Sequence, residues 1–439
     1  MKSAERRVVI TGFGVISPLG NSPEAMWEAL ANGTSGVRPL QSVPPDHLPI
    51  DGAGECWDFQ TSDINAFGPL EKKKQRNIKK NLKVACRDIQ MGVAAAQLAM
   101  NHAGLEDGVY DPDRTGVVYG SDYMMTVPEE FNDGVRSCLD EQKQFHFEEW
   151  GEKFPKQVDP LWLLKFLPNM PASHIAIYND MRGPNNSITI REASANLAVA
   201  EAACTIERGH ADIIITGSTG TRIHPLRSLH MALQEELATG RPAAELSRPF
   251  EKNRSGMVIG EGAGAMILES LESAKKRDVP ILGEIHGFGS SSVVAKNTVA
   301  HCGAALANVM RQALSTSGLS PDDVGHVHAH GLSTTKCDAE EAGAIRAVFE
   351  ERSTPVPVTA AKSYFGNLGA GAGLIELIAS LLAIGHGKLF PVLNYDTPDP
   401  ACDINIAMEF DTPPGDTVLS TNVTPQGQAS AILAGRFVE

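Results

Sequence analysis

The chain has 439 residues, of which 42% are hydrophobic, and a formal net charge of −15 at pH 7. This length can bury a large core, in two domains or in one large duplicated domain. The acidic balance argues against nucleic acid as a general partner, and the lack of a run of about 18 apolar residues predicts no membrane span.

Short apolar runs typical of buried strands recur along the chain. They predict strands in the first half at residues 8–10, 116–119, 211–216 and 264–268, and in the second half at residues 281–287, 324–329, 356–359 and 431–434. Apolar residues at helical spacing predict helices at residues 88–101, 196–207 and 372–384. Strands of this kind, alternating with helices, indicate an α/β protein whose sheets are covered on both faces.

The predicted boundary between the two halves lies near residues 269–279, where a charged stretch at 275–278 reads as an exposed connection. This gives an N-terminal half of residues 1–270 and a C-terminal half of residues 271–439. Within the first half, residues 126–172 are rich in charged and aromatic side chains and form an insertion.

The cysteines indicate a reducing compartment. Seven are scattered along the chain without a Cys-x-x-Cys pair, so we expect free thiols, no metal site and a cytoplasmic protein. The charged residues 1–7 pass directly into the first predicted strand and leave no room for the apolar stretch of a signal peptide.

Six motifs, which follow one another over most of the chain, carry a family resemblance. They are RVVITGFGVISPLG at residues 7–20, GPNNSITIREASAN at 183–196, RPF at 248–250 followed by GEGAG at 260–264, AHGLST at 329–334, KSYFGNLG at 362–369, and Asn394 with PDP at 398–400. In this order they resemble the β-ketoacyl-acyl-carrier-protein synthases, and specifically the 3-oxoacyl-ACP synthase II type.

The resemblance implies a thiolase-like fold, in which two βαβαβαββ halves stack as a five-layered α-β-α-β-α block. It also implies substrates carried on the phosphopantetheine of an acyl carrier protein, with no other cofactor. The expected assembly is a homodimer or a heterodimer with an active ketosynthase. In the family the region of residues 126–172 caps the substrate tunnel and contributes to dimer contacts, although an ordinary surface insertion explains it equally well.

Three positions of the expected catalytic site depart from the family pattern. Glu192, at the start of a predicted helix, stands where the family has the cysteine that carries the acyl chain. A carboxylate is a weak nucleophile and cannot form a thioester. Asn367 stands at the position of the second catalytic histidine, and an amide cannot carry a proton or a charge. Pro425 stands where the family has a gate residue whose backbone N–H serves the oxyanion, and proline has no N–H.

Other site residues are retained. His330 matches the first catalytic histidine, and Lys362, Asp338 and Glu341 match the polar network that supports it. Near the expected pantetheine arm, Thr334 is retained and Leu332 replaces a hydroxyl residue.

One basic run stands out in this acidic chain. It contains Lys72, Lys73, Lys74, Arg76, Lys79 and Lys80. A solvated helix face and a docking surface for an acidic carrier protein are equally good interpretations.

The departures predict that condensation is lost. The first hypothesis is a non-condensing partner subunit, resembling in kind the chain-length factors, although in that group the cysteine position is usually Gln. The second is an enzyme with altered acyl-thioester chemistry that uses Glu192 and His330. The third is a working 3-oxoacyl-ACP synthase, an acyltransferase, whose nucleophile motif has been misaligned.

Overall fold

The computed structural model describes residues 6–43, 48–296 and 299–439. The first residues of the charged N-terminal segment considered above lie outside this part. The strands are β1 (Val8–Ile16), β2 (Ala53–Gly54), β3 (Thr115–Ser121), β4 (Asn185–Thr189), β5 (Ile213–Thr221), β6 (Ile259–Ser270), β7 (Gly283–Ser292), β8 (His326–His328), β9 (Val358–Thr359), β10 (Thr417–Val423) and β11 (Gln428–Gly435). The helices are α1 (Pro23–Ala31), α2 (Lys72–Asn81), α3 (Arg87–His102), α4 (Pro128–Ser137), α5 (Trp150–Lys153), α6 (Met170–Tyr178), α7 (Ser194–Glu207), α8 (Pro225–Gln234), α9 (Leu271–Arg277), α10 (Cys302–Ser317), α11 (Thr335–Phe349), α12 (Lys362–Phe365) and α13 (Ala372–His386).

The strands repeat one pattern twice. Apart from β2, which pairs with β6, they follow the order β4-β3-β5-β6-β1-β7-β11-β10-β8-β9. From either outer edge inward, two parallel pairings are followed by two antiparallel ones. In chain order, β1-α3-β3-α6-β4-α7-β5-β6 is matched by β7-α10-β8-α11-β9-α13-β10-β11. The expected duplication of a βαβαβαββ unit is therefore confirmed.

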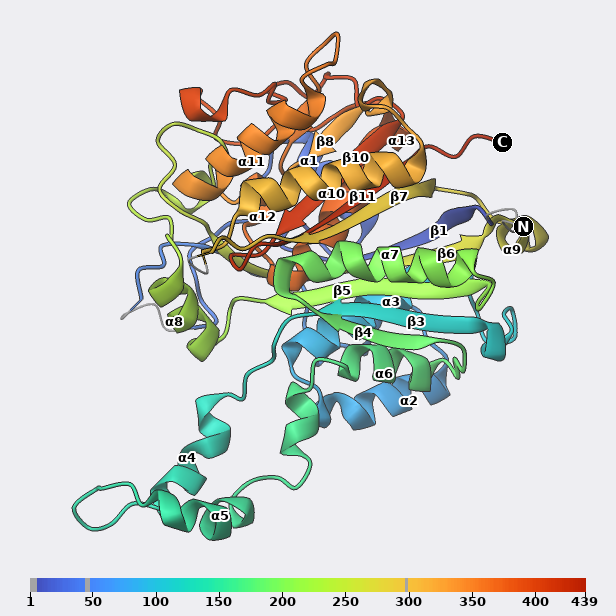
Figure 1. Cartoon of the computed structure of the whole chain (residues 1–439). Coiled ribbons are helices and arrows are strands. Elements are labelled where there is room, and N and C mark those ends of the chain that lie inside the picture. The colour runs from blue at the N-terminus through green and yellow to red at the C-terminus, as the bar shows by residue number, and fades with distance from the viewer. Residues whose placement is uncertain (1–5, 44–47, 297–298) are drawn as a thin grey trace.

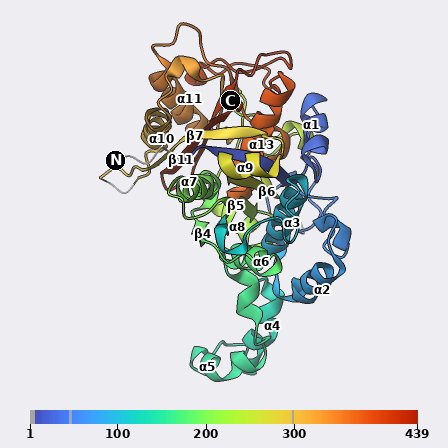
Figure 2. The same cartoon turned by 90° about the vertical axis from the view of Figure 1, so that its right-hand side faces the viewer.

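The two halves stack around a pair of central helices (Figure 1). α7 and α13 contact strands of both halves, α3 covers the outer face of the first half, and α10 covers that of the second. Figure 2 shows α3 and α10 on opposite sides of the strands. The largest core cluster lies around α7 and α13, whose buried faces are rich in Ala, Leu and Ile. This arrangement is the five-layered α/β block that the family resemblance implies.

All eight predicted strands and all three predicted helices form, but the two-residue strand β2 and the longer strands β4 and β10 were not predicted. β4 has the sequence Asn185-Asn186-Ser187-Ile188-Thr189, lies at the sheet edge and is partly exposed, so it has no apolar run. β10 is buried yet carries Ser420, Thr421 and Asn422. Thr421 and Asn422 bond to Glu341 and Glu376, which are tertiary contacts that the local sequence does not reveal.

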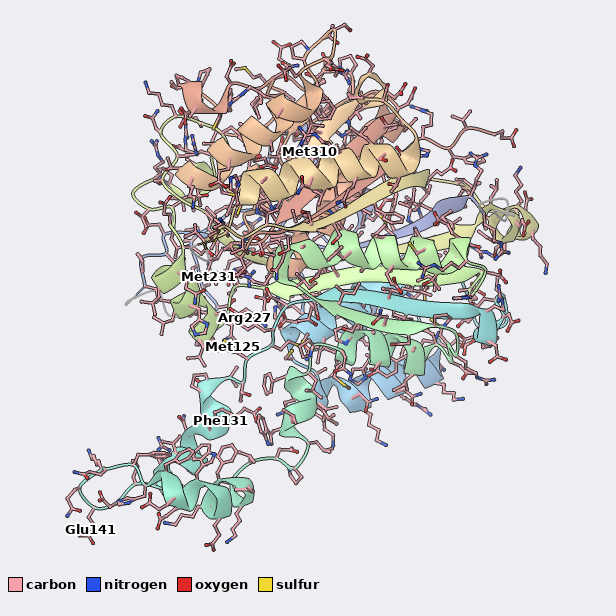
Figure 3. The ribbon with its side chains drawn as sticks, in the orientation of Figure 1. Met125, Phe131, Glu141, Arg227, Met231 and Met310 are labelled. Atoms are coloured by element: carbon pink, nitrogen blue, oxygen red, sulfur yellow. The ribbon has the colours of Figure 1, made fainter. Side chains whose placement is uncertain are left out.

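Most of the insertion of residues 126–172 forms an arm that projects from the body, whereas its last residues begin α6 in the body (Figures 1 and 2). Phe131 packs edge-on against Trp150, Phe154 and Trp162, so the arm has a small aromatic cluster of its own. Figure 3 shows Phe131 within the arm and Glu141 at its far end.

Candidate active site

The candidate site lies at the N-terminal ends of the two central helices. Glu192 belongs to a 3-10 turn (Arg191–Ala193) before α7, rather than to the helix that the sequence predicted to begin there. Asn367 comes a few residues before α13, and His330 follows β8. All three line one cavity of about 320 Å³. The structure therefore brings together residues that are 175 positions apart in the chain.

Close backbone packing makes this convergence possible. A methyl group on Gly373, in the first turn of α13, would lie only 2.1 Å from Oδ1 of Asn422. Glycine at this position lets α13 approach β10, which carries part of the polar network around His330.

Glu192 is fixed by contacts on both of its carboxylate oxygens. Arg222 Nη2 donates to Oε1 at 2.5 Å, and Asn367 Nδ2 donates to the same atom at 3.2 Å. Arg191 Nε lies 3.5 Å from Oε2. Arg222 is completely buried and also forms an ion pair with Asp122. Glu192 is thus part of a buried chain of charges.

These cations keep Glu192 ionised. Burial by itself raises the pKa of this carboxyl, but the guanidinium groups of Arg222 and Arg191 outweigh burial and hold the pKa well below its ordinary value of 4.5. A carboxylate in such a setting is a poor proton acceptor, because a useful general base has a pKa near the working pH. It is a fixed anion rather than a nucleophile.

His330 is neutral and oriented. Its Nδ1 faces two donors, Lys362 Nζ at 3.3 Å and Asn422 Nδ2 at 3.4 Å. We therefore assign the ring proton to Nε2, since Nδ1 acts as the acceptor. Burial, followed by the charge of Lys362, lowers the pKa of His330 well below its usual value. Lys362 in turn forms a buried ion pair with Glu376.

The two retained carboxyl groups hold the backbone around His330. Glu341 accepts hydrogen bonds from the backbone N–H groups of His330 at 2.7 Å and Gly331 at 2.8 Å. Asp338 accepts from Ser333 N at 3.0 Å. Burial raises the pKa of Glu341 to about 7 and that of Asp338 to about 6. Both act on the loop that follows β8 and do not reach the cavity.

Leu332, Thr334 and Pro425 line the same cavity. Pro425 lies in the hairpin between β10 and β11, where the backbone N–H groups of Thr424 and Gly427 bond to acceptors within the hairpin. Since Pro425 has no N–H, the backbone at Thr424, Pro425 and Gly427 offers no hydrogen-bond donor to the cavity.

The basic run and the arm lie elsewhere. The basic run forms α2, on which Lys72, Lys73, Arg76, Lys79 and Lys80 are exposed. Lys74 pairs with Asp107 at 2.9 Å. Figure 1 shows α2 well apart from α8, α10 and α11, which border the cavity. No residue of 126–172 lines this cavity, so the arm does not cap it within a single chain.

Sequence reasoning missed several members of the network: Asp122, Arg191, Arg222, Glu376 and Asn422. A signal existed for two of them. Asp122 directly follows β3 and Arg222 directly follows β5, and these strands are parallel neighbours. Because the carboxyl ends of parallel strands meet at one edge, a charged residue just after each apolar run indicates a pair.

The duplicated βαβαβαββ fold, with a cavity at the N-terminal ends of its two central helices, defines a protein of the thiolase-like fold. Sequence models of the Beta-ketoacyl synthase N-terminal and C-terminal domains match residues 5–274 and 282–396. The chain is 32% identical over 405 residues to 3-oxoacyl-acyl-carrier-protein synthase 2 of Staphylococcus aureus strain COL. The aligned region covers 92% of each protein. The chain therefore belongs to the β-ketoacyl synthase family.

Comparison with solved structures supports the same family assignment. One is a type II polyketide ketosynthase in complex with its acyl-carrier protein, at 27% identity and a TM-score of 0.81. Another is the ishigamide ketosynthase/chain length factor, at 26% identity and a TM-score of 0.82. Each comparison covers 99% of this chain and 100% of the other. These relatives support a role in fatty-acid or polyketide synthesis.

Within the described residues, one segment, Gly369–His386, is long and apolar enough to cross a membrane. In this structure 83% of it is buried. It consists mainly of α13, the central helix, and such burial is typical of a core helix in a soluble protein. The apolar composition of this segment by itself does not distinguish a membrane span from a core helix. Its burial agrees with the expectation of no membrane span.

Proposed function

We propose that this chain is a non-condensing subunit of carrier-linked fatty-acid or polyketide assembly, which pairs with an active ketosynthase as a chain-length factor does. The observation that carries the proposal is the state of Glu192. At the nucleophile position the chain has a carboxylate that is ionised, buried and bonded to Arg222 and Asn367. A group held in this way has no means of forming a thioester.

The remaining positions support the same conclusion. Asn367 bonds to Glu192 where the resemblance expects a second histidine, and Pro425 removes a backbone donor. The two cysteines of the cavity, Cys302 and Cys337, have raised pKa values, chiefly because of burial, so neither is an activated thiol. This argues against a misplaced nucleophile and a working synthase.

Partners, compartment and domain boundaries belong to the same proposal. An acyl carrier protein would present its pantetheine arm at Thr334 and Leu332, which line the cavity. Among the residues that the structure describes, the edge strand β4 pairs with β3 alone, which leaves its outer side available to a second subunit. We further propose a cytoplasmic protein whose halves divide near residue 270.

The proposal is tested with two preparations. The chain alone, supplied with an acyl carrier and a malonyl carrier, should yield no 3-oxoacyl product by mass spectrometry, whereas an intact ketosynthase assayed in parallel should. Co-expressed with a cysteine-containing ketosynthase of the same organism, the tagged chain should co-purify with it. Turnover by the chain alone, or an acyl adduct on a cavity cysteine, would overturn the proposal.

A second candidate is altered acyl-thioester chemistry by Glu192 and His330. It is favoured by their shared cavity and by the neutral His330, whose Nε2–H can donate a hydrogen bond to an acyl oxygen. The low pKa of Glu192 argues against a proton-transfer role for that residue. Consumption of acyl thioester by the chain alone, abolished in His330→Gln, would favour this second candidate.

A further inference from the structure

Arg191 joins three segments that surround the candidate cavity. Its Nη1 donates to Oε1 of Gln426, at the tip of the hairpin between β10 and β11, at 3.3 Å. Its Nη2 lies 3.7 Å from Oε1 of Glu235, which directly follows α8, and its Nε lies 3.5 Å from Oε2 of Glu192. Glu192 and Glu235 line the cavity, and so does Pro425, the neighbour of Gln426.

The backbone at Arg191 is held in an unusual conformation. Its φ of 47° lies in the left-handed region, which residues other than glycine rarely adopt. The preceding residue is fixed, because the backbone N–H of Ile190 donates to Oγ of Ser194 at 2.7 Å, and that hydroxyl donates to the carbonyl oxygen of Ser121 at 3.0 Å. Backbone strain of this kind persists where the surrounding structure enforces it, and it is concentrated at functional sites and switches.

The tip of the hairpin depends on Arg191 for its contact with the rest of the protein. Gln426 is exposed, and among the described residues Arg191 provides the one hydrogen bond that reaches it from outside the hairpin. Closer to the base of the hairpin, the backbone N–H of Val293 donates to the carbonyl oxygen of Gly427 at 3.0 Å. The base therefore stays anchored when the contact at the tip is broken.

Two cysteines lie where a movement of the tip would expose them. Cys302 Sγ lies 3.7 Å from the carbonyl oxygen of Thr424 in the hairpin, and Cys337 lines the same cavity. Both side chains are partly buried. Cys204, on α7, is also partly buried, but it does not line the cavity. The chain thus carries its own reporters of access to the cavity, with a matched internal control.

We propose that Arg191 is a strut that holds the hairpin tip against the end of α8 and so keeps one side of the cavity closed. A guanidinium group suits this role, because its planar fork presents donors in several directions at once. When the bond to Gln426 breaks, the tip moves outward and a ligand enters beside Pro425. The inference concerns access to the cavity and goes beyond the proposed function, since it does not depend on what happens to the ligand inside.

The test measures how fast N-ethylmaleimide alkylates each cysteine of the folded full chain, by mass spectrometry of its peptides. Gln426→Leu keeps the size of the side chain and removes the acceptor. It should raise the rates at Cys302 and Cys337 roughly tenfold, because a hydrogen bond to a charged group shifts an equilibrium by about that factor. The rate at Cys204 should stay the same.

Two further variants separate the strut from general effects. Arg191→Gly removes the whole strut and suits the positive φ, so it should raise the rates at Cys302 and Cys337 at least as much as Gln426→Leu. Arg182→Ala removes a guanidinium from an exposed ion pair with Asp180, and it should leave every rate unaltered.

Unchanged rates at the two cavity cysteines in Gln426→Leu would overturn the inference. An equal rise at Cys204 would overturn it as well, because it would indicate a general loosening of the fold and not an opened cavity. Neither result bears on the proposed function, because co-purification with a ketosynthase and the absence of condensation are measured separately.

Discussion

Glu192, Arg222 and Asp122 form a buried ion-pair chain at the site. Arg222 is fully enclosed and shares its guanidinium between the two carboxylates. Charges without water are tolerated in a protein only when they are paired and hydrogen-bonded. The chemistry of position 192 therefore depends on residues after β3 and β5 as much as on the residue itself.

Restoring a thiol should not restore condensation. Glu192→Cys alone should acylate poorly, because Asn367 and Pro425 remain. With Asn367→His added, we expect an acyl adduct by mass spectrometry, yet condensation still about 100-fold or more below that of an intact ketosynthase, since Pro425 offers no oxyanion N–H. Full activity from the single substitution would show that these other positions matter little.

Glu192 should also stabilise the fold in a pH-dependent way. Its folded pKa lies well below the ordinary value of 4.5, so its contribution is present above pH 4.5 and is lost as the pH falls. Glu192→Gln should lower the free energy of unfolding by about 2 kcal/mol at neutral pH. Below pH 4.5 the difference in unfolding free energy between the variant and the parent chain should narrow by about 1.4 kcal/mol per pH unit. Calorimetric melting of both proteins checks this, and a gap that widens on acidification would contradict it.

At the scale of single elements, α2 is the clearest candidate for a docking surface. It carries a run of cations in a protein whose net charge is −15, and most of them are exposed. Its only buried residue is Ile78, so the helix is fixed to the body on a narrow face. Lys74 is the exception among the basic residues, since it is paired with Asp107.

Reversing the exposed charges of α2 should weaken carrier binding. Lys73→Glu, Arg76→Glu and Lys80→Glu together should reduce the affinity for an acidic carrier protein roughly tenfold at low salt, as measured by surface plasmon resonance. Lys275→Glu with Lys276→Glu on α9 serves as the control for charge reversal elsewhere. Unchanged affinity in the α2 variant would refute this docking surface.

At the scale of the whole molecule, two surfaces of the single chain lack a packing partner among the described residues. β4 lies at one end of the strand order and, in the part of the chain that the structure describes, pairs on one side only. The arm carries exposed apolar side chains such as Phe147 and Leu161. Exposed strand edges and apolar patches of this kind usually mark an interface.

We therefore expect the chain never to be monomeric. Light scattering at micromolar concentration should give a molar mass close to twice the 46.9 kDa of one chain, or that of a heterodimer when a ketosynthase is present. A mass of a single chain under these conditions would refute the assembly.

The sequence by itself determined the fold and the family. Apolar runs such as residues 211–216 indicated buried strands, and the family resemblance carried by ordered motifs from residue 7 to residue 400 implied the duplicated α/β unit. It also placed Glu192, Asn367 and His330 in one site, because motif order is preserved when a fold is preserved. These inferences rest on local sequence patterns, which can be read from the chain without knowing its structure.

Only the tertiary structure decided how those residues behave. Strand ends indicate that Asp122 and Arg222 pair, but nothing local shows that Arg222 also bonds to Glu192 or that Asn422 faces His330. The extent of β6, the polar strand β10 and the separation of the arm were likewise unforeseen. Burial and charge pairing are properties of the packed chain, because the free energy of a buried charge depends on neighbours brought together only by folding.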